Sequence, residues 1–188
     1  KITKSLIIAL ALIALSTQSC QDYLDETLVS QVSAASYYTT AAGLEDAVDA
    51  TYSLLREIYS EERAYMMSVF GTDTHTNGAD GGWKSYNLYD NGLNASNQIL
   101  LDQWTFCYRG INQANAVINR STAVTDMSDA LKTQREAEVR FLRAFYYFYL
   151  VQTFGDIHLT LEETIGAQTS ANKTPQAEIY SQALIPDL

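Results

Sequence analysis

The sequence predicts an all-α protein, and two observations support this fold class. Four segments of the 188-residue chain carry apolar residues at three- and four-residue spacing, and residues typical of helix starts and ends flank them. Runs with alternating apolar and polar residues, which predict strands, are slight throughout. We therefore expect helices joined by long irregular loops, with little strand.

The first twenty residues, KITKSLIIALALIALSTQSC, predict an export signal. Lys1 and Lys4 precede an apolar run, residues 6–15, that as a helix would rise about 15 Å, roughly half the hydrocarbon core of a bilayer. Cys20 after this run resembles a bacterial lipoprotein box, although Thr17 stands where an aliphatic residue is usual. We predict a signal peptide at 1–19, acylation of Cys20 and a lipidated segment at 20–41. The alternative is an ordinary secretory signal with an incidental cysteine.

Charge and cysteine content exclude several kinds of partner. Removal of residues 1–19 takes away two lysines and no acid, which leaves 10 basic and 22 acidic residues, a net charge of −12. Such a domain repels phosphate backbones, so no nucleic-acid partner is expected. With Cys20 lipidated, Cys107 has no intrachain partner, and its apolar neighbours predict a small buried side chain. One free cysteine cannot build a metal site.

The first two helices are predicted at 42–59 and at about 97–118. Thr39 or Thr40 can cap the first helix. Its apolar stripe comprises Leu44, Ala47, Val48, Thr51, Leu55, Ile58 and Tyr59. The stripe of the second comprises Leu100 or Leu101, Trp104, Cys107, Tyr108, Ile111, Ala114 and Ile118.

The third predicted helix carries seven aromatic rings in a short stretch. A capping box at residues 133–136 starts it, and Gly155 is placed to end it. Ala137, Phe141 and Ala144 form the small–aromatic–small pattern of a tetratricopeptide-like helix pair, and this stripe continues through Phe145, Phe148 and Val151. A helix apolar on most sides is expected to lie between neighbours, and Arg143 among the rings requires a carboxylate or carbonyl partner.

A fourth helix is predicted from Thr174, with Pro175 at its first position and Pro186 kinking or ending it. Two long loops separate the helices. Residues 71–97 are dense in Gly, Asn and Asp and also contain aromatic residues, whereas residues 160–173 are polar and without distinctive features. Loops of this length are usually functional or disordered, and the aromatic residues argue against disorder.

The third helix and the segments around it resemble one family. AEVRFLRAFYYFYLVQTFGDIHL, residues 137–159, is similar to the hallmark of the SusD/RagB family of outer-membrane nutrient-binding lipoproteins. Matching segments precede and follow it in the family's order: CQDYLD at 20–25, WTFCYRGINQANAVI at 104–118 and TPQAEIYSQALIPDL at 174–188. His158 departs from the family pattern, which usually has Pro after Gly-Asp.

The resemblance implies an α-helical SusD-like fold with tetratricopeptide-like helix pairs and long loops. It implies a lipid-anchored protein on the cell surface at the outer membrane, which captures oligosaccharides, or in some members peptides. A SusC-type TonB-dependent transporter would receive the ligand, without catalysis and without a cofactor. Because the family's chains extend well past Leu188, residues 42–188 are expected to be the N-terminal part of the helical domain.

The loop at 71–97 holds the candidate ligand-binding residues. Sugar recognition uses flat apolar faces that stack on C–H bonds and planar polar groups that bind hydroxyls. The loop offers Trp83, Tyr86 and Tyr89 for stacking and Asp73, Asn77 and Asn87 for hydrogen bonds. The alternative is a loop folded on itself through its own Asx turns and rings.

Two other functions have weaker support in the sequence. Residues 73–80 loosely resemble a calcium loop, but the twelfth position is Lys84 and not a bidentate Glu, so no metal site is predicted. No catalytic residues are predicted, because the adjacent acids Glu61–Glu62 and Glu162–Glu163 are expected to be solvated. A tetratricopeptide scaffold that binds proteins remains an alternative, although regular 34-residue repeats are not evident.

Overall fold

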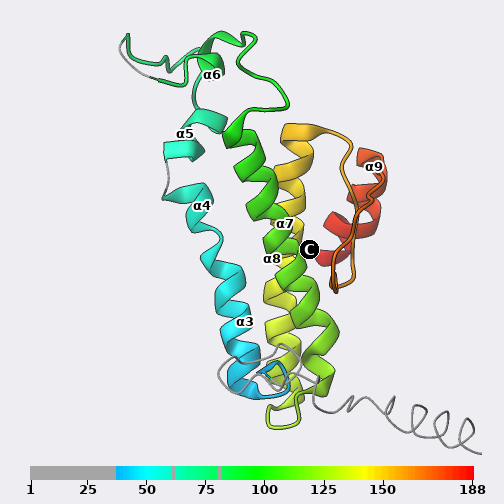
Figure 1. Cartoon of the computed structure of the whole chain (residues 1–188). Coiled ribbons are helices and arrows are strands. Elements are labelled where there is room, and N and C mark those ends of the chain that lie inside the picture. The colour runs from blue at the N-terminus through cyan, green and yellow to red at the C-terminus, as the bar shows by residue number, and fades with distance from the viewer. Residues whose placement is uncertain (1–36, 61, 80–81) are drawn as a thin grey trace, which may run out of the picture. The chain divides into compact units, whose positions relative to one another are not determined.

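Three helices form the framework of the fold. A computed structural model describes residues 37–188 except residues 61 and 80–81, so the predicted signal and Cys20 lie outside the described residues (Figure 1). Helix α7 (Gln98–Arg120) packs along α8 (Asp129–Phe154), and α3 (Ala41–Ser53) packs against both. No strand forms in this part of the chain, and the prediction of an all-α fold is confirmed.

Helix α3 begins as predicted but ends early. The Thr40 hydroxyl accepts a hydrogen bond from the Gly43 amide at 3.1 Å and caps the helix. The continuous helix predicted at 42–59 is wrong, because α3 stops at Ser53 and the short helices α4 (Arg56–Tyr59) and α5 (Glu62–Ser68) follow. The Ser53 hydroxyl donates to the Ala50 carbonyl, a local side-chain bond that competes with the regular helical pattern.

Helix α7 is capped by Asn97 and lies close to α8. The Asn97 side chain accepts from the amides of Ile99 and Leu100, at 3.1 and 3.4 Å. Gly110 faces Tyr146 of α8 so closely that a Cβ there would lie 2.4 Å from the tyrosine ring. The missing side chain at residue 110 therefore lets the two helices approach. Cys107 is fully buried, as predicted, and burial raises the pKa of its thiol.

Helix α8 starts five residues earlier than its sequence predicts. Ser128 is the N-cap, with its hydroxyl 3.3 Å from the Leu131 amide, and residues 133–136 lie inside the helix. The capping box predicted there is wrong because Thr133 donates to the Asp129 carbonyl and Glu136 accepts from Ser121 of the preceding turn (η2, Ser121–Ala123). At the other end, Gly155 has a φ of +74° and terminates the helix, as expected.

The predicted packing stripe of α8 is only partly buried. Phe141 and Phe148 are 55% and 44% exposed, and Ala137 is exposed as well, so their assignment to the core is wrong. The buried residues of α8 are Val139, Leu142, Arg143, Ala144, Tyr146, Tyr147, Leu150 and Val151. The spacing of small and aromatic residues could not separate the buried residues of α8 from the exposed ones, because both sets are largely apolar.

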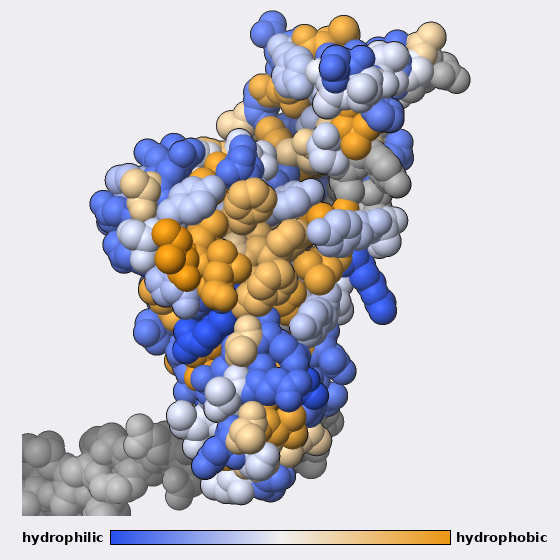
Figure 2. Space-filling view, turned by 180° about the vertical axis from the view of Figure 1, so that it is seen from behind, coloured by the Kyte–Doolittle hydropathy of each residue, from blue (hydrophilic) through white to orange (hydrophobic). Residues whose placement is uncertain are grey.

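The exposed phenylalanines line an apolar groove. Together with Tyr180, Ile185 and Leu188 they border a hollow of about 370 Å³ between α8 and the last turns of the chain. Figure 2 shows this side as a continuous hydrophobic patch over α8 and the C-terminal segment. Helix α8 was expected to lie between neighbours, and among the described residues this apolar side of it is left open.

Arg143 has the partner that its burial requires. The guanidinium forms two hydrogen bonds with the carboxylate of Asp187, at 2.6 and 2.8 Å, and both residues are buried. A third bond of 2.6 Å joins Arg143 to the Asn115 side chain on α7. This network fastens the end of the chain to the two longest helices.

The C-terminal segment folds back on α8 through one backbone bridge. The Thr174 amide donates to the Ile157 carbonyl at 2.7 Å, and a helix follows Pro175. This helix comprises α9 (Gln176–Ile179), a π-helical part (η3, Tyr180–Leu184) and α10 (Ile185–Asp187). The π part widens the backbone just before Pro186, which lacks an amide and would otherwise clash with the preceding turn.

Candidate functional site

The loop between α5 and α7 contains every predicted ligand-binding residue. It is irregular except for a short helix, α6 (Ser85–Leu88), as expected from its sequence. A small apolar cluster lies beneath it, made of Met66, Tyr86 and Ile99 with partly buried neighbours that include Phe70 and Leu93. The loop is therefore anchored on its own core next to the start of α7.

Asn87 and Asn77 hold the loop together. The Asn87 side-chain oxygen accepts hydrogen bonds from the amides of Gly71 and Asn77, at 3.3 and 3.2 Å. Asn77 in turn donates from its side chain to the Gly82 carbonyl. These bonds agree with the alternative to ligand binding that the sequence left open, a loop folded on itself. They engage the side-chain amides of both Asn77 and Asn87.

Tyr86 is also part of this support. Its side chain is only 5% exposed, and its hydroxyl donates to the side-chain oxygen of Asn97, the residue that caps α7. Burial, the largest influence, raises the pKa of the Tyr86 hydroxyl. Its ring faces are covered by protein, so Tyr86 positions the loop and does not offer a face for stacking.

Trp83 and Tyr89, by contrast, expose their rings. Trp83 is 50% and Tyr89 68% exposed. Both residues have left-handed backbones, with φ of 63° and 53°, a conformation that is uncommon for bulky residues and costs on the order of 1–3 kcal/mol. They lie at the two ends of α6, and the Tyr89 ring packs over Gly71. Asp73 is exposed in the same loop.

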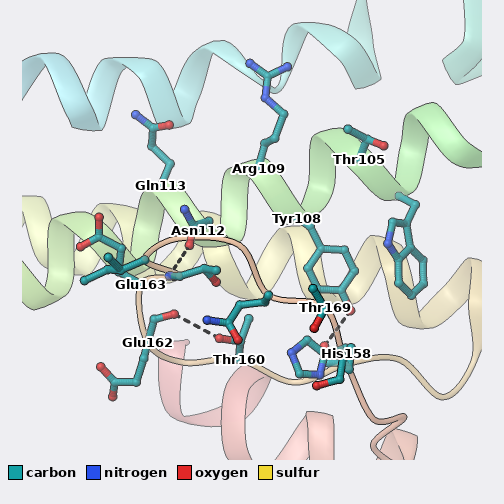
Figure 3. A pocket seen from close by; sticks show the side chains of 16 residues that line it. Thr105, Tyr108, Arg109, Asn112, Gln113, His158, Thr160, Glu162, Glu163 and Thr169 are labelled. Carbon is teal, nitrogen blue, oxygen red and sulfur yellow. Dashed lines mark hydrogen bonds between the residues drawn. The ribbon is translucent and has the colours of Figure 1, made fainter. Parts of the chain in front are cut away.

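A second concave surface lies on α7, away from the predicted site. An open pocket of about 980 Å³ lies between α7 and residues 158–171 (Figure 3). Trp104, Tyr108 and His158 supply its rings: the centroids of Trp104 and Tyr108 are 4.8 Å apart, and His158 stacks on Tyr108 at 6.4 Å. The sequence indicated Trp104 and Tyr108 only as helix-packing and family-spacing residues.

The floor of this pocket is fixed by a row of side chains along α7. The Tyr108 hydroxyl donates to the His158 carbonyl at 2.7 Å, and the Asn112 side chain accepts from the Thr164 amide at 2.7 Å. Asn115 donates to the carbonyls of Thr160 and Glu162, at 3.2 and 3.0 Å. Residues 108, 112 and 115 share one face of the helix, so they hold residues 158–164 along it.

Charged groups at this floor are paired. Arg120 forms two hydrogen bonds with the carboxylate of Glu163, at 2.6 and 3.0 Å, and Asn119 donates to Glu162 at 2.8 Å. The expectation that both acids are simply solvated is wrong for Glu163, whose side chain is 15% exposed. The sequence predicted a loop at residues 160–173 but not the contacts that hold it on α7, because these contacts join residues more than 40 positions apart.

Among the described residues, no helix is long and apolar enough to cross a membrane. Within the same residues, no group of three or more His, Cys, Asp or Glu side chains is placed to hold a metal ion.

A family model identifies the chain. Residues 22–185 match the SusD-like model described as starch-binding and associating with the outer membrane. The chain belongs to this SusD-like family. A SusD-like protein of Formosa agariphila is 26% identical over 187 residues, which cover 96% of this chain and 36% of the relative. The chain thus spans about a third of that relative's length.

Two solved structures share the fold of the SusD-like chain. A SusD superfamily protein from Parabacteroides distasonis matches 78% of this chain and 32% of its own, with 23% identity and a TM-score of 0.61. A laminarin-binding SusD-like protein matches 80% of this chain and 35% of its own, with 23% identity and a TM-score of 0.66. The resemblance that the sequence motifs indicated is confirmed.

Proposed function

We propose that this SusD-like protein captures oligosaccharides at the cell surface through the loop between α5 and α7. The observation that carries the proposal is the exposure of Trp83 and Tyr89 on strained backbones at the ends of α6. Backbone strain of this kind concentrates at ligand-binding and other functional sites. Flat rings presented on an anchored loop suit the C–H faces of sugar rings, and the exposed carboxylate of Asp73 suits their hydroxyls.

Family membership supports this ligand class. The matching family model is described as starch-binding, and one structural relative is described as laminarin-binding. Starch and laminarin are both neutral glucans, and a neutral ligand is compatible with a domain as acidic as this one. Maltoheptaose and laminariheptaose are therefore the first probes to use.

The binding role predicts association without turnover. Calorimetry of the whole chain with each probe should give a saturable, reversible signal, and the recovered sugar should be intact. Release of shorter sugars would contradict the binding role and favour an enzyme. The absence of binding to both probes and to a wider glycan array would overturn the proposed function.

Anchoring and partnership belong to the same proposal. Acylation at Cys20 would hold the protein at the outer membrane, and a SusC-type TonB-dependent transporter would receive the ligand. Membrane fractions of cells that make a Cys20→Ala variant should lose the protein; unchanged attachment would exclude a lipid anchor at this residue. A TonB-dependent transporter encoded immediately upstream would support the partnership.

The alternative of a peptide-binding tetratricopeptide scaffold has less support. The face of α7 that carries Tyr108, Asn112 and Asn115 already binds an extended segment, residues 158–164 of the same chain. A peptide in that place would have to displace these hydrogen bonds. We therefore favour the oligosaccharide.

A further inference from the structure

We propose that the pocket between α7 and residues 158–171 is a second site for a neutral oligosaccharide, separate from the loop that carries Trp83. This inference rests on the proposed function for the ligand class and adds a place on the molecule. Its volume of about 980 Å³ is at the upper end of the range for ligand pockets, which run from about 300 to 1,000 Å³.

The pocket has a rigid aromatic wall. The Tyr108 ring is held by its hydroxyl bond to the His158 carbonyl and by stacking with the His158 ring. Trp104 lies against Tyr108 on one side and meets the edge of Phe154 at 5.2 Å on the other. Trp104 and Tyr108 remain partly exposed, so the ring surface that their aromatic neighbours leave open can meet a ligand without first rearranging.

Polar side chains without a hydrogen-bond partner among the described residues also line the pocket. Among the described residues, the side chains of Arg109, Gln113 and Gln168 have no hydrogen-bond or ion-pair partner, although all three line the pocket. In the view of Figure 3, Asn112 points from α7 toward residues 158–164, whereas Arg109 and Gln113 extend from the other side of the helix. The free groups of Arg109 and Gln113 thus lie at the edge of the open pocket, beside its rings and not on the side of α7 that faces residues 158–164.

The local charges favour a neutral ligand. The carboxylate of Glu163 is satisfied by Arg120, and that of Glu162 by Asn119. Arg109 is the one basic residue that lines the pocket, beside two acids. An anionic ligand would therefore meet little net attraction, whereas rings, amides and a guanidinium together suit a polyol with C–H faces.

The two tryptophans of the chain allow each site to be observed alone. Trp83 lies in the loop and Trp104 in the pocket, and the sequence contains no other tryptophan. In Trp83→Phe, selectively excited fluorescence reports the pocket; in Trp104→Phe, it reports the loop. Each variant of the whole chain would be titrated with maltoheptaose and laminariheptaose, and circular dichroism would verify its fold.

The proposal expects a saturable change of Trp104 emission in the Trp83→Phe variant. Replacing both Arg109 and Gln113 with Ala in that background should raise the dissociation constant from the Trp104 titration about two- to tenfold for each hydrogen bond lost. The same pair of substitutions in Trp104→Phe should leave the Trp83 titration unchanged. Leu101→Ala is the matched control, since Leu101 is exposed on α7 and outside the pocket.

The outcomes separate the second site from the proposed function. If the Trp83 emission responds to sugar but the Trp104 emission does not change with either probe, the second site is wrong and the proposed function stands. If Trp104 responds but the substitutions have no effect, the signal is indirect and the second site is likewise rejected. If neither tryptophan responds and calorimetry detects no binding, both proposals fail.

Discussion

At the scale of single residues, burial separates side chains that look alike in the sequence. Phe141 and Leu142 are neighbours on α8, yet Phe141 is 55% and Leu142 only 1% exposed. Likewise Tyr86 is buried beneath the loop, whereas Trp83 and Tyr89 of the same loop are exposed. The sequence identified these aromatic residues as a group. Which of them are buried and which are exposed depends on contacts with residues that are distant in the chain.

The first prediction compares these two neighbours. Leu142→Ala should lower the free energy of unfolding by about 2–5 kcal/mol, because it leaves a cavity in the main hydrophobic core. Phe141→Ala should cost less than about 1 kcal/mol, because the side chain is largely exposed. Urea denaturation of the two variants measures the difference. A loss at Phe141 equal to that at Leu142 would show that the phenylalanine is covered.

At the scale of the elements, the sequence predicts the long helices well and their junctions poorly. The caps Thr40 and Asn97 and the terminator Gly155 act as their residue types indicate. The break after Ser53 was missed, and the sequence predicted a kink or an end at Pro186 where the helix instead widens into a π part, because these features depend on local side-chain bonds and backbone geometry. Arg143 had to find a partner, but only the fold identifies Asp187, 44 residues away.

The second prediction tests the contact between α7 and α8. Gly110→Ala should destabilise the protein by about 1–3 kcal/mol through overpacking, although alanine in a helix would otherwise gain about 1 kcal/mol over glycine. The Tyr146 ring cannot move away easily, since it is fully buried and its hydroxyl donates to the Thr51 carbonyl at 2.7 Å.

Thermal unfolding monitored by circular dichroism measures this effect. Gly82→Ala is the matched control, because a Cβ at residue 82 would meet nothing within 4 Å. The control should unfold close to the temperature of the parent protein. A Gly110→Ala variant as stable as the parent would contradict the close approach of the two helices.

At the scale of the whole molecule, helix periodicity and motif order were sufficient for the all-α fold and the family. The candidate site was predictable in part: the loop was located, but only in three dimensions do its six candidate residues divide into three supports, two exposed rings and the exposed Asp73. The α7 pocket was not predictable, since it combines one helix face with a loop some 50 residues later in the chain. Its anchors, such as the bond from Tyr108 to His158, are long-range contacts.

The third prediction concerns the pH dependence of stability. Burial raises the pKa of Tyr147 to about 12 and raises those of Tyr108 and Tyr146 as well. An unfolded tyrosine titrates near pH 10, so above that pH the unfolded chain binds fewer protons than the folded chain. Stability from these groups should be constant below about pH 10 and fall as the pH rises toward 12. Urea midpoints measured from pH 8 to 12 test this; a flat profile would contradict the burial.

The most direct test of the central claim is a calorimetric comparison of the parent chain with Trp83→Ala. The glycan that binds the parent best serves as the ligand. Loss of stacking on one ring should weaken binding about 5- to 150-fold, on the order of 1–3 kcal/mol by analogy with other stacked rings, while the unfolding temperature stays the same. Unchanged affinity in a folded Trp83→Ala variant would contradict the assignment of the loop as the binding site.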